Sequence, residues 1–239
     1  MAKFEKLNLL NYPIFFMTKE TTCPYLKNKS EKRLVTDLNN NPFLFDELSI
    51  SGFRRIENWM YRPSCQNCSE CKSYRINIKK FLLTKSLKRI RKNNTEVKVL
   101  LKKNIKTKKY YNLFSSYQNN RHTGSSMSFM TFEDFKSMIE TSPINTQLYE
   151  FRNNKNKLIG LMLFDYQKDG LSAVYSFYDI ELKKNGLGNY MILELIELGK
   201  KLNLKYIYLG YYIKNAERMN YKLKFKEGEL FSDGKWTKI

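Results

Sequence analysis

The chain has 239 residues, with 43 Lys and Arg against 23 Asp and Glu, so its formal net charge is +20. A composition of 42% hydrophobic and 15% aromatic residues is typical of a globular protein and excludes a disordered basic tail. No segment approaches the roughly 20 apolar residues that cross a bilayer, so we expect a cytoplasmic protein without membrane contact. The charge favours a polyanionic partner such as nucleic acid. The alternative is a cytoplasmic enzyme whose surface became basic through drift in base composition.

The four cysteines form the first motif along the chain. Three of them follow the spacing C-x2-C-x2-C, and the full set is Cys23, Cys65, Cys68 and Cys71. Disulfides are rare in the cytosol, so this spacing indicates metal binding or redox chemistry. Four thiolates would complete a structural or redox site for zinc or for an iron–sulfur cluster, with no open position for a catalytic water. The alternative is a reduced cluster of thiols without a metal.

The basic charge is concentrated in one segment. Residues Lys79 to Lys109 contain thirteen Lys or Arg and one acid, Glu96. Apolar residues interleave with these charges, so the segment is expected to fold. We predict a short helix capped by Ser86, followed by a half-buried strand in which Val97, Val99 and Leu101 alternate with Lys98, Leu100 and Lys102. A second helix is predicted up to Arg121, from aromatic residues at helical spacing: Tyr110, Phe114 and Tyr117.

The second half of the chain has the pattern of a mixed α/β fold. A capping box formed by Thr131 and Asp134 predicts the start of a helix. Three strands separated by turn sequences predict an antiparallel meander. These strands are Thr146–Arg152, Leu158–Tyr166 and Leu171–Tyr178. The sequence Gly186-Leu187-Gly188 then predicts a turn into a helix. The last predicted elements are that helix, a Tyr-rich strand and a hairpin: Asn189–Leu202, Lys205–Ile213 and Asp233-Gly234.

Several short motifs together resemble one enzyme family, in the right order and over nearly the whole chain. The motifs are T-C-P-Y-L (Thr22–Leu26), G-F-R-R (Gly52–Arg55), Y-R-P-x-C-x2-C-x2-C (Tyr61–Cys71), R-H-x4-M (Arg121–Met127), V-Y-S-F-Y-D (Val174–Asp179) and Y-L-G-Y-Y-I-x5-M-x-Y-K (Tyr208–Lys222). With these motifs the chain resembles the bacterial aspartate/glutamate leucyltransferases, which are relatives of the eukaryotic arginyl-tRNA–protein transferases. The chain departs mildly from the usual pattern of this family at two places. The usual S-L-G is Gly186-Leu187-Gly188 here, and the usual Y-L-G-Y-W is Tyr208–Tyr212, with Tyr at its end.

The resemblance implies a fold related to the N-acetyltransferase superfamily, with two such lobes. We expect a mixed α/β chain of largely antiparallel sheets with flanking helices. The predicted lobes are residues 1–105, with the cysteines and the basic segment, and residues 106–239. The resemblance also implies transfer of Leu from leucyl-tRNA to the α-amino group of proteins that begin with Asp or Glu, which marks them for N-degron proteolysis. No cofactor is required for such a transfer.

Candidate site residues follow from the chemistry of this reaction. A planar guanidinium is the natural reader of an acidic substrate residue, and the candidates within the motifs are Arg54, Arg55, Arg62, Arg75 and Arg121. The amine must lose a proton and the ribose oxygen must gain one. The candidates for these catalytic steps are His122, Tyr175 and Asp179. Alternative roles are an orienting His122 and purely structural arginines.

The basic segment is the candidate contact for tRNA phosphates. Its predicted tRNA-binding residues are Lys85, Lys88, Arg89, Arg91 and Lys92. The expected partners are leucyl-tRNA and proteins with N-terminal Asp or Glu, and we expect a monomer. Two other functions remain open from the residues alone. One is an acyltransferase that uses acyl-coenzyme A, and the other is a metal-containing RNA-binding module without catalysis. The choice of Leu over Arg as the donor rests on the resemblance.

Overall fold

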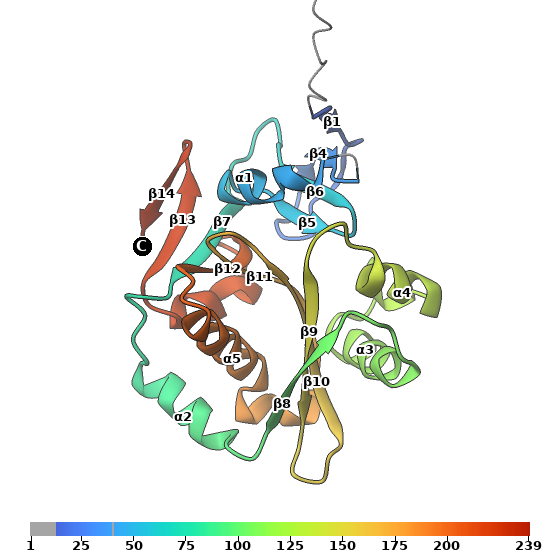
Figure 1. Cartoon of the computed structure of the whole chain (residues 1–239). Helices are drawn as coiled ribbons and strands as arrows, with labels where there is room; N and C mark the ends of the chain where they lie inside the picture. Colours follow the sequence, from blue (N-terminus) through green and yellow to red (C-terminus); the bar gives the residue numbers. More distant parts are fainter. Residues whose placement is uncertain (1–12, 40) are drawn as a thin grey trace, which may run out of the picture.

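The computed structural model describes residues 13–39 and 41–239, and the chain folds as a mixed α/β protein (Figure 1). An eight-stranded sheet has the order β14-β13-β7-β12-β11-β10-β9-β8. All its neighbouring strands are antiparallel except the parallel pair β11 and β12. The strands are β7 (Lys72–Asn77), β8 (Lys98–Lys103), β9 (Thr146–Arg152), β10 (Leu158–Tyr166), β11 (Gly170–Tyr178), β12 (Tyr206–Tyr212), β13 (Gly228–Ser232) and β14 (Lys235–Lys238). The predicted class and meander are confirmed.

A smaller antiparallel sheet is formed by the N-terminal part of the chain. It has the order β1-β4-β6-β5 and lies beside the upper end of the large sheet in Figure 1. Its strands are β1 (Phe16–Met17), β4 (Arg33–Asp37), β5 (Arg54–Ile56) and β6 (Trp59–Pro63), and a separate pair is formed by β2 (Thr21–Thr22) and β3 (Ser30–Glu31). The helix α1 (Phe45–Ile50) precedes β5.

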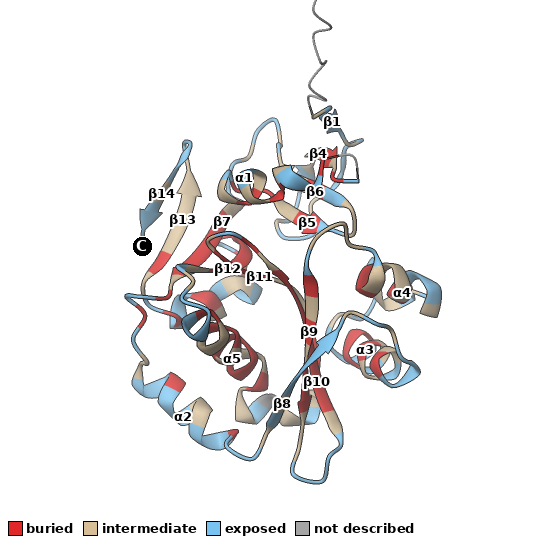
Figure 2. Ribbon diagram, viewed as in Figure 1, coloured by how far each residue is buried: buried red, intermediate tan, exposed pale blue. Residues whose placement is uncertain are grey.

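Helices cover both faces of the large sheet (Figure 1). On one side lies α5 (Leu187–Lys201), with α2 (Lys85–Asn93) packed against it. On the other side lie α3 (Lys108–Arg121) and α4 (Phe132–Glu140). The buried positions follow the strands and the inner faces of these helices, as Figure 2 shows. Short 3-10 turns complete the described elements: Pro42–Leu44, Ser126–Phe129, Ile180–Asn185 and Glu217–Lys224.

Local sequence signals explain where the helices begin. The Thr131 hydroxyl accepts from the Asp134 amide at 3.2 Å, and the Asp134 carboxylate accepts from the Thr131 amide at 2.8 Å, so the capping box is confirmed. Thr84, rather than Ser86, caps α2, because its hydroxyl accepts from the Leu87 amide. The predicted cap was therefore wrong by two residues. Gly186 precedes α5 at a φ of +70°, and a Cβ there would lie 2.9 Å from Ile90 of α2.

Strands from both sides of the predicted boundary at residues 105 and 106 share the large sheet. β7 pairs with β12 and β13, and β8 pairs with β9. The large hydrophobic core therefore contains residues from both predicted lobes, whereas the small sheet has a separate cluster of buried residues: Leu38, Phe45, Phe53 and Met60. The position of the domain boundary itself stays a prediction. Within the described part of the chain, no helix is long and apolar enough to cross a membrane.

Candidate active site

A cleft of about 740 Å³ lies where the two sheets meet the C-terminal end of α3. Its walls come from β5, α3, β11, β12 and the turn Glu217–Lys224, together with the loop at Pro24 and Tyr25. The cleft brings together four predicted site residues that are far apart in the sequence: Arg54, Arg121, His122 and Tyr175. Arg218 also lines it, and none of the lining residues is Asp or Glu. The cleft is therefore suited to an anionic ligand.

Arg54 lies on the small sheet and reaches across to the large one. Its Nη2 donates to the Ala173 carbonyl oxygen at 2.7 Å, while Nη1 is buried without a hydrogen-bond partner among the described residues. Gly210 of β12 makes room for the guanidinium, since a Cβ at this position would lie 3.1 Å from Arg54 Cζ. Its φ of +79° also favours glycine. Both N–H donors of Arg54 Nη1 are therefore unpaired among the described residues.

Gln118 and Tyr175 form a buried polar pair on the cleft wall. Gln118 Nε2 donates to the Tyr175 hydroxyl at 2.6 Å, and Gln118 Oε1 has no partner among the described residues. Burial raises the pKa of Tyr175, partly offset by this hydrogen bond and by Arg121, so the phenol keeps its proton at neutral pH. An unpaired buried carbonyl costs about 1–3 kcal/mol. A ligand that donates to Gln118 Oε1 would remove this cost.

His122, the only His of the chain, ends α3 at the cleft. Its ring packs edge-on against Tyr117, with 5.5 Å between the ring centroids. Burial lowers the pKa of His122, and the positive charges of Arg121 and Arg218 lower it further. The imidazole is therefore mainly neutral at pH 7 and is able to accept a proton.

Lys222 has a buried side-chain amine and is not among the site residues predicted from the sequence. Its side chain donates to the Tyr211 carbonyl and to Met219 Sδ, the latter at 3.5 Å. Burial and the nearby Arg54 lower the pKa of Lys222 to about 7, against an opposing effect of Cys71. Lys222 and the cleft residue Tyr221 belong to the motif M-x-Y-K, which is the signal that marked this segment in the sequence.

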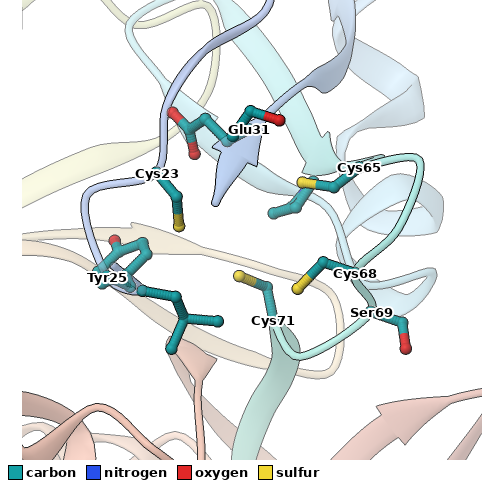
Figure 3. Close-up of a pocket in the computed structure, with 10 residues that line it drawn as sticks. Cys23, Tyr25, Glu31, Cys65, Cys68, Ser69 and Cys71 are labelled. Atoms are coloured by element: carbon teal, nitrogen blue, oxygen red, sulfur yellow. The ribbon is translucent and has the colours of Figure 1, made fainter. Parts of the chain in front are cut away.

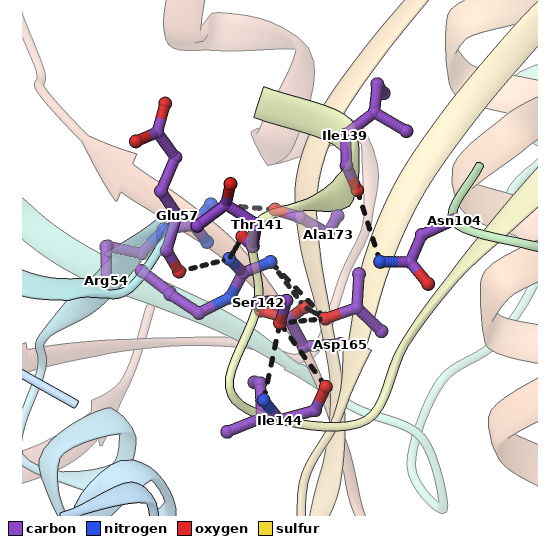
Figure 4. A network of polar contacts seen from close by, with 11 residues as sticks. Arg54, Glu57, Asn104, Ile139, Thr141, Ser142, Ile144, Asp165 and Ala173 are labelled. Carbon is purple, nitrogen blue, oxygen red and sulfur yellow. Dashed lines mark hydrogen bonds and ion pairs between the residues drawn. The ribbon is translucent and has the colours of Figure 1, made fainter. Parts of the chain in front are cut away.

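The structure places Arg55 outside the cleft, in contrast to its predicted role in substrate binding. Its guanidinium forms two hydrogen bonds of 2.7 Å with Asp165, and both side chains are almost fully buried. The other donors of Arg55 bond to oxygens of Glu57, Thr141 and Thr146. Figure 4 shows this network around Asp165. All five donors are used, so Arg55 has none left for a substrate.

Arg75 and Arg62 also lie away from the residues that line the cleft. Arg75 pairs with Glu229 at 2.7 Å and stacks between the rings of Tyr206 and Trp236, at 3.5 and 4.1 Å from their centroids. The Arg62 guanidinium lies 5.0 Å from the Phe53 ring centroid. These contacts occupy both arginines away from the cleft, and their predicted role in substrate binding stays a prediction.

Asp179 lines a different groove and is paired with Lys157 at 3.1 Å. Its other oxygen accepts from the Glu181 amide at 3.2 Å. The carboxylate is therefore occupied in fixing the end of β11. The structure therefore does not bring Asp179 together with the other predicted catalytic residues, His122 and Tyr175, and its role as the general base stays a prediction.

Comparison with known proteins identifies the family of this chain. The model of the arginine-tRNA-protein transferase C terminus matches residues 109–232, and the model of the N terminus of the same family matches residues 21–89. An aspartate/glutamate leucyltransferase of Granulibacter bethesdensis is 38% identical, over 94% of this chain and 85% of that protein. One of Paramagnetospirillum magneticum is 37% identical, over 94% of this chain and 93% of that protein. The chain belongs to this family of aminoacyl-tRNA–protein transferases.

The solved structure of L-PGS from Bacillus licheniformis is more distant. It is 11% identical to the transferase, with a TM-score of 0.44 over 73% of this chain and 50% of that one.

The four cysteines of the transferase line one small pocket of about 30 Å³ (Figure 3). All four are free thiols, and Figure 3 shows them gathered between the loop at Cys23 and the turn that precedes β7. Burial and the other three thiols raise the pKa of Cys71 to about 12. Among the described residues, no three His, Cys, Asp or Glu side chains are placed to hold a metal ion. Tyr25 lines both this pocket and the cleft.

The predicted tRNA-binding residues of the transferase lie on α2, outside the cleft. Arg91 is paired with Glu197 of α5 at 2.8 Å, which fixes the helix on its neighbour. The other four side chains are exposed: Lys85, Lys88, Arg89 and Lys92. Of the aromatic residues beside the basic segment, Tyr110 is buried and donates to Glu150 at 2.7 Å, whereas Tyr117 lines the cleft.

Two cleft residues had no signal in the sequence. Gln118 lies one helical turn before the R-H motif, and Arg218 lies just before Met219 in the C-terminal motif. A glutamine or arginine in a helical or turn segment is ordinarily a surface residue. The tertiary contact of α3 with β11 is what turns Gln118 toward Tyr175.

Proposed function

We propose that this protein transfers leucine from leucyl-tRNA to the α-amino group of proteins whose N-terminal residue is Asp or Glu. Membership in the aminoacyl-tRNA–protein transferase family carries this proposal, together with the names of the relatives. The cleft supports it, because three arginines and no acidic residue line it. We further propose that such a product enters N-degron proteolysis, and that the reaction takes place in the cytoplasm, where aminoacyl-tRNA is the donor.

The reaction is aminolysis of an ester. The amine nitrogen bonds to the leucyl carbonyl carbon, the bond from that carbon to the ribose oxygen breaks, and the proton of the amine ends on the ribose oxygen. An α-amine has a pKa of about 7.7–8.0, so part of it is already neutral at pH 7. Alignment of the amine and the ester therefore accounts for much of the rate.

The cleft residues have distinct roles in this proposal. The free Nη1 of Arg54 binds the carboxylate of the acidic substrate residue. The neutral imidazole of His122 accepts a proton, and the protonated phenol of Tyr175 donates toward the developing charge. The exposed Arg121 and Arg218 at the same cleft contact the 3′-terminal phosphates of the tRNA.

One assay separates the three functions that the residues left open. The purified protein is incubated with radiolabelled leucyl-tRNA and peptides that begin with Asp, Glu or Ala. We expect label on the Asp and Glu peptides only. Arginyl-tRNA in parallel tests the donor, and acetyl-coenzyme A without tRNA tests the acyltransferase alternative. Binding of tRNA without product in any arm would favour the non-catalytic RNA-binding module.

We also propose that the four thiols have a structural or redox role, and that their side chains reorient to close around zinc or an iron–sulfur cluster, since in this structure no three of them are placed to hold a metal ion. The gathering of all four in one pocket supports this. The site does not enter the transfer reaction. Protein prepared anaerobically should contain zinc or iron by elemental analysis, and Cys68→Ser should reduce the content. Absence of both metals from the wild type would leave a cluster of reduced thiols.

A further inference from the structure

Three buried polar atoms of the cleft residues have no hydrogen-bond partner within the described part of the chain. They are Arg54 Nη1, Gln118 Oε1 and Ser125 Oγ. Buried polar groups in proteins are nearly always paired, so unpaired atoms gathered in one cleft indicate a missing ligand. Arg54 offers a positively charged donor, and Gln118 offers a neutral acceptor. The complementary ligand carries an anionic acceptor and an N–H donor within one small unit.

We propose that Gln118 Oε1 accepts a hydrogen bond from the incoming α-amine and positions it for attack, while Arg54 holds the side-chain carboxylate of the same residue. This assignment rests on the proposed function. It adds Gln118 as an amine-binding residue, and Gln118 lies outside all the motifs that the chain shares with the family.

The surroundings of Gln118 leave its oxygen available for this role. The side chain is 1% exposed, and its Nε2 is already used by the Tyr175 hydroxyl at 2.6 Å. With this bond in place, Oε1 lies on the side of the amide away from the hydroxyl. Gln118 also lies in the last turn of α3, which is anchored to β11 by Phe114 against Phe177.

The same segment of β11 holds both groups. Arg54 is tied to the Ala173 carbonyl, and Gln118 is tied to the side-chain hydroxyl of Tyr175, two residues further along the strand. Both groups line the same cleft, where one Asp or Glu residue offers an amine and a carboxylate together. An uncharged N-terminal residue would leave Arg54 Nη1 unpaired.

Electrostatics also favour an amide over a carboxylate at this position. An ionised acid would stabilise the ammonium form of the amine and raise its pKa, whereas only the neutral amine attacks. An amide oxygen binds the amine without this effect. The neighbouring guanidinium groups of Arg54, Arg121 and Arg218 disfavour the ammonium form further. The cleft therefore attracts the carboxylate and delivers the amine uncharged.

The test compares Gln118→Leu with Asn119→Leu, an exposed amide on the same helix that does not line the cleft. For Gln118→Leu we expect a roughly 10- to 100-fold fall in kcat/KM for an Asp peptide. The KM for leucyl-tRNA should stay unchanged, because the tRNA does not use this oxygen. Asn119→Leu should behave as the wild type. Unchanged kcat/KM for the peptide in Gln118→Leu would overturn the inference. A rise in the KM for leucyl-tRNA by a similar factor would also overturn it.

The pH profile separates amine binding from a structural effect. In Gln118→Glu the new carboxylate should raise the pKa of the bound amine, so the acid limb of kcat for peptide transfer should shift to higher pH. In Gln118→Leu the limb should stay in place. An unshifted limb in Gln118→Glu would contradict the assignment. If the wild type itself transfers no Leu to Asp or Glu peptides, the proposed function fails rather than this inference.

A thermodynamic cycle of peptide-binding constants tests the inference even if the variants are inactive. The dissociation constants of an Asp peptide and of its des-amino analogue, in which hydrogen replaces the α-amino group, are measured for the wild type and for Gln118→Leu. Removal of the amine and the substitution remove the same hydrogen bond, so their effects should be non-additive. Additive effects would show that the amine and Gln118 do not interact, and would overturn the inference.

Discussion

Two adjacent arginines on β5 have opposite roles. Side chains alternate between the faces of a strand, so Arg54 points to the cleft while Arg55 enters the buried ion pair with Asp165. The motif G-F-R-R marked both as candidates, and their chemistry is the same. Only the packing of the small sheet on the large one distinguishes them, because Asp165 lies on β10, more than a hundred residues away.

Arg55→Ala should lower the stability of the fold. It leaves the Asp165 carboxylate buried without its partner, which costs about 3–5 kcal/mol. Chemical denaturation at pH 7 measures this loss. A change of less than about 1 kcal/mol would contradict the structural role.

Arg54→Ala should abolish transfer to Asp and Glu peptides while it leaves the stability and the binding of leucyl-tRNA close to those of the wild type. Arg54 has one hydrogen bond to a backbone carbonyl and an unpaired Nη1, so little structure depends on it. Peptide kinetics and circular dichroism test the two parts. Full transfer by Arg54→Ala would remove this residue from the site.

Lys222 should make stability depend on pH. Its folded pKa of about 7 lies below the ordinary value of 10.5, so between these values the unfolded state binds more protons. Stability should therefore rise with pH above 7, by up to about 1.4 kcal/mol per pH unit for one proton. Below pH 7 both states are protonated and the slope from this group disappears. Denaturation at pH 7–9 should show this slope in the wild type but not in Lys222→Met; parallel curves would contradict it.

At the scale of elements, the site is built at the meeting points of α3, β11 and β12 with the small sheet. The aromatic spacing predicted α3 and its end near Arg121, and the structure confirms both. Helical periodicity does not say which strand the helix will face. The placement of Tyr175 beside Gln118 therefore depends on how α3 packs on β11, and Asp179 is removed from the cleft by its position at the end of the same strand.

The exposed charges of α2 should account for part of the salt dependence of tRNA binding. Substitution of four of its residues with Gln keeps the Arg91–Glu197 pair intact: Lys85, Lys88, Arg89 and Lys92. Each lost phosphate contact should make the slope of log K against log salt shallower by roughly 0.7–0.9. Binding of leucyl-tRNA at several salt concentrations measures the slope. An unchanged slope would exclude α2 from the tRNA interface.

At the scale of the whole molecule, the small sheet depends on the large one. Its own core contains four buried hydrophobic residues, which is little for an independent unit. The two sheets are joined by the Arg55–Asp165 pair, by the Trp236 indole donating to the Ile50 carbonyl at 2.8 Å, and by the Tyr211 hydroxyl donating to the Gly52 carbonyl at 3.2 Å.

We therefore expect both sheets to unfold in one transition. The chain has two tryptophans, Trp59 on β6 of the small sheet and Trp236 on β14 of the large sheet. Trp59→Phe and Trp236→Phe each leave one fluorescent reporter. In each variant the midpoint by fluorescence should coincide with the midpoint by far-ultraviolet circular dichroism. An earlier fluorescence midpoint for Trp59 would show that the small sheet unfolds separately.

The sequence alone determined the mixed α/β class, most helices and strands, and the family, because these depend on periodicity, turn chemistry and short motifs that are local in the chain. It also marked Arg54, Arg121, His122 and Tyr175, which the cleft unites. Only the tertiary structure decided which candidates have free hydrogen-bonding groups. Arg55 and Asp179 lie outside the cleft, and their partners, Asp165 and Lys157, are brought to them by strand packing. Gln118 entered the site for the same reason, since long-range packing decides whether a polar side chain is satisfied by the fold or left for a substrate.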